Sequence, residues 1–423
     1  MKVCILAYGC SASFSDSEIM AGLLRESGFE IVDNPEKSDL NVIVTCNVKL
    51  PTEKRMVNKI KELTKLKKPL IVGGCMPITQ REIIERINPR ASLIGPNSVQ
   101  KIVEVANETL KGKKVVFLED LKKPKVCLPR VQRNPIIHIT QISTGCNRAC
   151  AYCIVRFNKG SLFCYPTDSI IKDIKDAISR GKKEIWITSQ DNASYDFNGK
   201  NLASLLEEVC KLDGKFFVRI GMMNPASVKK ILEELIEVYE NEKIFKFLHL
   251  PLQSGSNRIL ELMNRGYTRE EFLEMVKSFR KNLPRITIAT DIIVGFPGES
   301  ERDFEETLEV LEKIKFDIVN ISKFGARPLT PASKLKQLDQ RIIKERSKKA
   351  HELVNRIKEE LNEKWVGWEG EVLIDEKGIG NTWVGRNYCY KPIVIESKEN
   401  ILGKFVKVKI KEAKANYLKG VLE

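Results

Sequence analysis

Three cysteines near the middle of the chain have a spacing suited to an iron–sulfur cluster. Cys146, Cys150 and Cys153 form the run Cys-Asn-Arg-Ala-Cys-Ala-Tyr-Cys. Cysteine thiolates are the usual protein ligands of 4Fe-4S clusters, and three of them leave the fourth iron without a protein ligand. An iron that is open in this way can bind a small molecule. The run therefore predicts a reactive cluster rather than a simple electron carrier.

A structural zinc site is the main alternative for these cysteines. Zinc ligands usually come as two short pairs of Cys or His residues, which supply four ligands in total. The chain contains only three His, and none of them lies within the cysteine run. The lack of a second pair beside the run favours the cluster over zinc.

Three further cysteines each follow a predicted strand in the first part of the chain. Apolar runs at 3–8, 40–45 and 70–73 alternate with helical patterns, which indicates a parallel sheet. Because the carboxyl ends of parallel strands border one crevice, we expect the cysteines after them to converge. One such thiol would be interpreted as a small buried side chain. Three of them predict a second cluster, with the ligands Cys10, Cys46 and Cys75.

Composition limits the cell compartment and the kind of partner. The chain has 423 residues and a net charge of +15, which favours a polyanionic partner such as nucleic acid. A generally charged surface, as in thermophile proteins, is the alternative. The N-terminus lacks a signal-peptide pattern and no long apolar segment follows, so we expect a cytoplasmic protein with reduced thiols and no membrane contact. We interpret the other five cysteines as structural or incidental: Cys4, Cys127, Cys164, Cys210 and Cys389.

The middle of the chain predicts a partial barrel after a linker. Residues 119–135 contain three prolines and several basic residues, which is typical of a linker. Repeated strand and helix patterns follow, as in a parallel barrel with its chemistry at the carboxyl ends of the strands. Six strands close only part of such a barrel and leave room for a large substrate. They are expected at 136–143, 184–190, 216–222, 245–252, 286–294 and 318–324.

The last part of the chain predicts a small antiparallel β-barrel. Alternating strands are expected at 369–374, 382–397 and 404–411, after a charged helix at 341–364. In the last of these strands Lys407, Lys409 and Lys411 share one face, which predicts a surface for nucleic-acid phosphates. An ordinary solvated strand face is the alternative. The predicted class is thus α/β, with a doubly wound parallel-sheet domain at 1–118, the linker at 119–135, a partial (β/α)6 barrel at 136–363 and the small barrel at 364–423.

Together these features resemble the radical S-adenosylmethionine (SAM) methylthiotransferases over essentially the whole chain. The family pattern Gly-Cys-x-x-Asn-x-x-Asp-Ser-Glu matches Gly9, Cys10, Asp16, Ser17 and Glu18, and the other five cluster cysteines also match. Blocks similar to the family lie at 249–257, 263–268, 290–299 and 327–332, and the terminal barrel is similar to its RNA-binding TRAM domain. Two positions depart from the pattern, because Ser13 replaces the usual Asn and Lys159 the usual Arg.

The resemblance implies cofactors and site residues. It implies two 4Fe-4S clusters, an auxiliary cluster on the triad Cys10, Cys46 and Cys75 and a radical cluster on the triad Cys146, Cys150 and Cys153, with all six cysteines in catalysis. One SAM molecule would donate a methyl group to sulfur on the auxiliary cluster, and another would be cleaved to a radical. SAM would contact residues at the barrel rim, which we expect to be Tyr152, Gln190, Gln253, Ser254 and Gly295.

The resemblance also indicates a substrate. The segment 219–225, Arg-Ile-Gly-Met-Met-Asn-Pro, resembles the archaeal and eukaryotic branch, which adds a methylthio group to C2 of N6-threonylcarbamoyladenosine at position 37 of tRNA. Such an enzyme needs an external electron donor and a sulfur source, and we expect a monomer. The alternatives are methylthiolation of isopentenyladenosine in tRNA, methylthiolation of an aspartate in a ribosomal protein, and a non-catalytic iron–sulfur protein that binds RNA.

Overall fold

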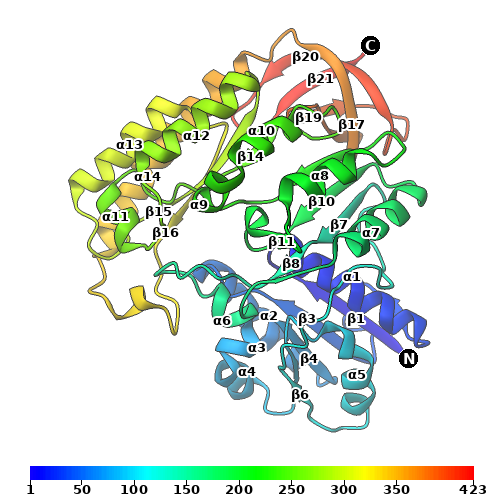
Figure 1. Cartoon of the computed structure of the whole chain (residues 1–423). Helices are drawn as coiled ribbons and strands as arrows, with labels where there is room; N and C mark the ends of the chain where they lie inside the picture. The colour runs from blue at the N-terminus through cyan, green and yellow to red at the C-terminus, as the bar shows by residue number, and fades with distance from the viewer.

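Short apolar runs in the first part of the chain form a six-stranded parallel sheet. The computed structural model describes all residues, 1–423. The sheet has the order β2-β1-β3-β4-β5-β6, and helices cover both of its faces (Figure 1). The doubly wound domain predicted from the sequence is confirmed. Its main elements are β1 (Lys2–Ala7), α1 (Ser11–Glu26), β2 (Glu30–Val32), β3 (Leu40–Thr45), α2 (Leu50–Lys65), β4 (Leu70–Gly74), α3 (Met76–Thr79), α4 (Arg81–Ile87), β5 (Ser92–Ile94), α5 (Ile102–Leu110) and β6 (Val116–Phe117).

The segment that follows β6 has no regular secondary structure, but it is not a free tether. It runs along α1, where a Cβ on Gly22 would lie 2.2 Å from the Pro129 carbonyl carbon. The Val131 amide donates a hydrogen bond to the Glu18 carbonyl. Lys125 is 2% exposed, and its Nζ lies 2.8 Å from Asp16 Oδ1. The segment predicted as a linker therefore also packs against the N-terminal domain.

Six parallel strands in the middle of the chain form two sheets of three. One sheet has the order β7-β10-β13 and the other β14-β15-β16, and a parallel bridge between Val218 and Ile244 joins them. Each predicted strand is present, although every one is shorter than expected. Their bounds are β7 (Ile137–Gln141), β10 (Glu184–Thr188), β13 (Phe217–Ile220), β14 (Phe247–His249), β15 (Thr287–Val294) and β16 (Ile318–Lys323).

Amphipathic helices cover the outer face of these strands. A core of 49 buried residues lies between strands and helices, and it includes Ile185, Val218 and Leu248. Residues next to these in the strands, such as Trp186 and His249, have side chains on the inner face of the partial barrel. The helices are α6 (Val155–Lys159), α7 (Thr167–Ser179), α8 (Leu202–Cys210), α9 (Pro225–Val228), α10 (Leu232–Tyr239), α11 (Asn257–Leu262), α12 (Arg269–Asn282), α13 (Glu301–Ile314) and α14 (Gln340–Glu363).

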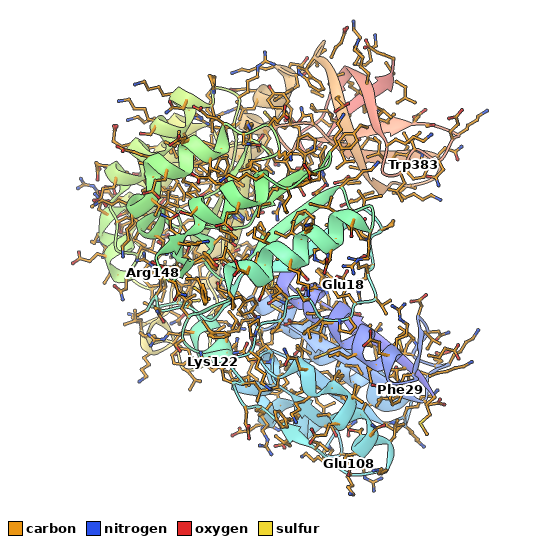
Figure 2. All side chains as sticks on the ribbon, turned by 45° about the vertical axis from the view of Figure 1, so that its right-hand side comes forward. Glu18, Phe29, Glu108, Lys122, Arg148 and Trp383 are labelled. Carbon is orange, nitrogen blue, oxygen red and sulfur yellow. The ribbon has the colours of Figure 1, made fainter.

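The C-terminal residues form a closed barrel in the order β17-β18-β19-β21-β20. It lies at the opposite end of the molecule from the N-terminal sheet, as the positions of Trp383 and Glu108 show (Figure 2). The single strand expected at 382–397 is a hairpin instead, because a turn in which Tyr390 has φ of 61° divides it. The final strand was not predicted. The strands are β17 (Glu369–Lys377), β18 (Thr382–Arg386), β19 (Pro392–Glu396), β20 (Phe405–Ala413) and β21 (Leu418–Leu422).

Candidate active site

The first cysteine triad lies at the carboxyl ends of three neighbouring strands. Cys10 follows β1, Cys46 follows β3 and Cys75 follows β4, and these strands are adjacent in the sheet. The Cys75 amide donates a hydrogen bond of 3.1 Å to the Thr45 carbonyl, which ties two of the three loops together. The three thiols are close enough for their charges to affect one another's pKa. The structure thus brings together the residues predicted as auxiliary ligands.

Glycine permits the close approach of Cys10 and Cys46. Gly9 has φ of 125°, and a Cβ at this position would lie 2.7 Å from the Cys46 Cβ. Ser13, which departs from the family pattern, lies in the same place, with its Oγ 3.7 Å from the Cys10 Sγ. Any larger residue at position 9 would push the two cysteine loops apart.

Burial keeps most of the thiols protonated in the absence of a bound metal. Desolvation raises the pKa of Cys46 and raises that of Cys75 to about 12. In the second triad, desolvation raises the pKa of Cys146 and raises that of Cys153 to about 12. Binding of iron would therefore release protons from these thiols.

The second triad lies in one loop after β7, and neighbouring loops hold it. The Ala151 amide donates to the Met263 carbonyl, and the Ala151 carbonyl accepts from the Ala332 amide, each at 2.9 Å. The Cys146 amide donates to the Gly160 carbonyl at 3.1 Å. These backbone bonds fix the loop at the carboxyl ends of the barrel strands, where its cysteines were predicted to be.

A buried arginine contacts this loop directly. Arg265 is 5% exposed, and its Nη1 lies 3.3 Å from the Cys150 Sγ and 3.2 Å from the Tyr152 hydroxyl. Its Nη2 donates to the Pro251 carbonyl at 3.0 Å. Although burial opposes the charged form, the hydroxyl and thiol groups of Tyr152, Tyr267 and Cys150 hold the pKa of Arg265 well above its usual range. The guanidinium therefore places a positive charge beside the second triad.

The donor groups fit clusters better than a single metal ion. No three His, Cys, Asp or Glu side chains lie close enough together to hold one ion. In a cluster each thiolate binds its own iron, so the thiols of each triad need not converge on a point. Buried polar atoms without a hydrogen-bond partner also occur at and just after the carboxyl ends of β7 and β10, as expected where a polar ligand completes a site. They include Gln141 Oε1, Ser143 Oγ, Ser189 Oγ, Gln190 Oε1 and Asn192 Oδ1.

Sequence comparison places each part of the chain in a known family. Residues 2–95 match the uncharacterized protein family UPF0004, residues 140–311 the Radical SAM superfamily and residues 363–422 the TRAM domain. A probable threonylcarbamoyladenosine tRNA methylthiotransferase of Pyrococcus horikoshii is 42% identical, over 99% of both chains. The chain belongs to the threonylcarbamoyladenosine tRNA methylthiotransferase family. Members from Xenopus laevis and Homo sapiens are 35% and 34% identical to this chain. The matches cover 99% of this chain and 76% and 73% of those two proteins.

Solved structures share the fold of this methylthiotransferase at low sequence identity. The radical S-adenosylmethionine methyltransferase TsrM from Kitasatospora setae, solved with cobalamin and a 4Fe-4S cluster, has a TM-score of 0.59 and 14% identity. The match covers 78% of this chain and 77% of the TsrM chain. The cobalamin-dependent S-adenosylmethionine radical enzyme OxsB, solved with aqua-cobalamin and S-adenosylmethionine, has a TM-score of 0.55 and 14% identity, and the match covers 86% of this chain and 56% of that chain. These similarities concern the fold alone.

The five residues predicted to contact SAM differ in whether their polar atoms already have partners within the protein. Gln190 has a buried, unpartnered Oε1, and Tyr152 contacts Arg265. Ser254 is 1% exposed and its Oγ lies 3.4 Å from the Thr307 hydroxyl, so packing against α13 already accounts for it.

The two remaining residues of this set have unusual backbone geometry. Gln253 has φ of 74°, and its amide and carbonyl hydrogen bond to Asp291 and Ile293 of β15. Gly295 has φ of 79°, and a Cβ on it would lie 2.4 Å from Ile343 in α14. Backbone shape alone therefore explains the glycine, while contact of either residue with SAM stays a prediction.

Two polar groups on the barrel were not assigned a role from the sequence, although they lie in or beside the segments that it singled out. His249 Nε2 lies 3.0 Å from Asp291 Oδ2 on the inner face, and the His249 hydrogen bond holds the pKa of Asp291 low even though burial opposes this. Asp191, beside Gln190, accepts from the Asn224 amide and the Ser227 hydroxyl, and Arg148 lies 4.0 Å from it. Figure 2 shows Arg148 on the side where the barrel faces the N-terminal domain. Asp191 directly follows one predicted strand and Asp291 lies in another. These positions are the signal in the sequence that could have identified both acids as site residues.

The lysines predicted to contact RNA lie on one face of β20, but two of them have acidic partners. Lys407 Nζ lies 3.0 Å from Glu423, and Lys409 pairs with Glu369. Lys411 is exposed and forms no salt bridge. None of the helices is both long and apolar enough to pass through a lipid bilayer.

Proposed function

We propose that this chain converts N6-threonylcarbamoyladenosine at position 37 of tRNA to its 2-methylthio derivative, with two 4Fe-4S clusters and SAM. The observation that carries the proposal is the presence of two separate cysteine triads, each at the carboxyl ends of parallel strands, in a member of this family. An iron–sulfur protein that only binds RNA does not require a second triad with an open iron. The similarity to a probable threonylcarbamoyladenosine tRNA methylthiotransferase over 99% of both chains supports RNA as the substrate.

The bound clusters and SAM supply one-electron chemistry, which can replace a hydrogen on a carbon too weakly acidic for a side-chain base. The residues of this chain hold and orient those groups. Cys146, Cys150 and Cys153 would bind the radical cluster, and Arg265 would place a positive charge beside it. Ser189 and Gln190 offer unpartnered polar atoms at the rim, where the polar groups of SAM need partners.

The inner face of the barrel has the groups needed to handle a proton near a substrate. His249 and Asp291 form a hydrogen-bonded pair at 3.0 Å, and their side chains remain partly exposed at 16% and 22%. A His oriented by a carboxylate can accept a proton and return it. We infer that this pair would hold or move a proton at the His249 imidazole when a substrate lies against the inner face of the barrel.

A test of the proposal is nucleoside mass spectrometry. The cluster-reconstituted protein is incubated without oxygen with SAM, a strong reductant and tRNA that carries N6-threonylcarbamoyladenosine. We expect a new 2-methylthio nucleoside and about eight irons per chain. The matched control is the Cys210→Ala protein, because Cys210 lies in α8 and belongs to neither triad.

The other interpretations give different results in the same assay. If product formed from tRNA with isopentenyladenosine but not from tRNA with threonylcarbamoyladenosine, the assigned substrate would be wrong and the assigned chemistry would be right. If product formed only with a ribosomal protein, the substrate would be a protein and not RNA. Tight RNA binding with full iron content and no SAM cleavage would make the chain a binding protein and contradict the proposal.

A further inference from the structure

The side chain of Lys159 has no partner although it lies inside the protein. Lys159 is 3% exposed, and its Nζ makes no hydrogen bond. An ammonium group has three donors and no acceptor. Burial of a charge without an opposite charge is costly, so such groups are normally paired. The position of Lys159 therefore indicates that an anionic partner completes its surroundings.

The cysteines of the first triad are the groups available for this role. The titratable neighbours of Lys159 are the Asp16 carboxylate, the thiols of Cys75, Cys10 and Cys46, and a second buried cation, Lys125. The Asp16 carboxylate is already engaged, since its Oδ1 accepts from Lys125 Nζ at 2.8 Å and from Gln141 Nε2 at 2.9 Å. Three thiolates on a cluster would provide the negative charge that the lysine lacks.

The lysine reaches this site from the second domain. It is the last residue of α6, which lies beside α3 (Figure 1). Asn158, the residue before it, donates to Asn47 Oδ1 at 2.8 Å and accepts from the Thr79 hydroxyl at 2.7 Å. The Asn97 side chain donates to the Lys159 carbonyl at 3.0 Å. The backbone of Lys159 is thus fixed to the N-terminal domain on several sides.

The same segment is joined to the second triad. Gly160 follows Lys159 directly, and its carbonyl accepts the hydrogen bond from the Cys146 amide. Gly160 has φ of 71°, so this turn suits glycine. Two adjacent residues therefore serve both triads: the Lys159 ammonium lies beside the first triad, and the Gly160 carbonyl hydrogen bonds to the second.

We propose that Lys159 is a positioning residue for the auxiliary cluster, and that its ammonium supplies the positive charge that sets the reduction potential of that cluster. The proposal rests on the proposed function in one respect, the assignment of Cys10, Cys46 and Cys75 as ligands. Reduction adds negative charge to a cluster, and a buried cation nearby stabilises the reduced form. The reduction potential of the auxiliary cluster therefore reaches its higher value only when the barrel domain is docked on the N-terminal domain.

The test uses the full-length chain with Cys146, Cys150 and Cys153 replaced by alanine, so that only the auxiliary cluster forms. In this background Lys159→Met removes the charge at similar size, and Lys159→Arg keeps the charge. Lys182→Met is the matched control, because Lys182 is likewise buried, with 5% exposure, but its Nζ donates to the carbonyls of Asn134 and Pro135. Iron content is measured first, and the potential is then followed by electron paramagnetic resonance during reductive titration.

We expect the potential to fall in Lys159→Met and to stay near the starting value in Lys159→Arg and Lys182→Met. Equal potentials in Lys159→Met and its parent would overturn the proposal. If Lys159→Met loses iron, retention by Lys159→Arg supports the role of charge, and loss by both variants contradicts it. A parent chain that binds no iron at all would instead refute the ligand assignment in the proposed function.

Discussion

The two cysteine triads of this methylthiotransferase are built from very different lengths of chain. Cys146, Cys150 and Cys153 share one loop, whereas Cys10, Cys46 and Cys75 follow three different strands. The first arrangement needs one loop and its neighbours. The second exists only when β1, β3 and β4 are paired in register. The auxiliary triad therefore depends more strongly on the fold of its whole domain.

The two triads also differ in the origin of the positive charge next to them. Arg265 belongs to the same domain as Cys150, which its guanidinium contacts at 3.3 Å. Lys159 comes from the barrel domain and lies among thiols of the N-terminal domain. The radical triad is thus complete within its own domain, whereas the auxiliary triad needs its neighbour. Loss of domain docking should consequently harm the auxiliary site first.

The largest expected effect separates the two triads by chemistry. Cys146→Ala should abolish cleavage of SAM, since it removes a ligand of the radical cluster, and no methylthio product should form. Cys10→Ala should abolish the methylthio product but keep SAM cleavage. Chromatography of 5′-deoxyadenosine and of tRNA nucleosides measures both activities. If Cys10→Ala also stopped SAM cleavage, the division of work between the triads would be wrong.

The difference between the triads also explains what could be predicted from the sequence. A run of three cysteines within a few residues indicates a cluster without knowledge of the fold, and strand periodicity was enough to place Cys10, Cys46 and Cys75 at one edge of a sheet. That either triad binds iron stays a prediction. The contacts of Arg265 and the isolation of Lys159 depend on how loops and domains dock, which no local pattern records.

Local patterns were least informative where one residue type serves several purposes. Gly295 in a glycine-rich turn suggested a SAM contact, but the turn also has to admit Ile343 of α14. Likewise Ser254 bonds to Thr307 within the protein. The last strand, β21, was missed because Leu418–Leu422 is short and contains a glycine, and the turn at Tyr390 was missed because it lacks the usual glycine.

A second prediction concerns the arginine of the radical triad. Arg265→Met should lower the rate of SAM cleavage by roughly 10- to 100-fold, the usual cost of losing a residue that contacts a metal ligand. Arg265→Lys should recover only part of the rate, because an ammonium cannot bond Cys150, Tyr152 and Pro251 in the same planar arrangement. Rates of 5′-deoxyadenosine formation are compared at equal iron content. Unchanged rates in both variants would show that Arg265 only packs the loop.

A third prediction tests whether the auxiliary triad depends on docking. Arg327, after β16, donates to the Asn47 carbonyl at 2.9 Å and to the Glu53 carboxylate at 2.5 Å, and it is 5% exposed. Arg327→Met leaves Glu53 without its cation, and removal of one partner of a buried ion pair costs about 3–5 kcal/mol. On mild heating this variant should lose auxiliary iron before radical-cluster iron.

The matched control for docking is an exposed ion pair. Lys315 and Glu360 lie 2.6 Å apart with both side chains 45% exposed, so Lys315→Met should cost at most about 1 kcal/mol. Iron per chain is measured after heating, in proteins that carry only one triad. Equal loss of iron from both triads in Arg327→Met would contradict the greater dependence of the auxiliary site on its neighbour.

The smallest expected effect lies at the junction of the barrel with the C-terminal domain, far from the auxiliary triad. Glu184 and Asp375 are fully buried there, and desolvation raises the pKa of both, from ordinary values of 4.5 and 3.8. Glu184 Oε2 and Asp375 Oδ1 are buried without a hydrogen-bond partner, so neither carboxyl group is fully compensated in its charged form. A raised folded-state pKa contributes stability that is fully present below the ordinary values and is lost as pH rises through the raised ones.

Glu184→Gln should weaken this pH dependence, because one of the two titrating carboxyl groups is replaced by an amide and the repulsion that raises the pKa of Asp375 is lost. The variant should therefore unfold at a higher temperature than the parent at neutral and alkaline pH, with a difference that shrinks as the pH falls. Glu371→Gln, at an exposed pair with Lys215 in the same junction, should show no such trend. Neither substitution should change the iron content of either triad. Iron loss from the auxiliary triad in Glu184→Gln would mean that its stability depends on the whole molecule rather than on docking at α6 and Arg327.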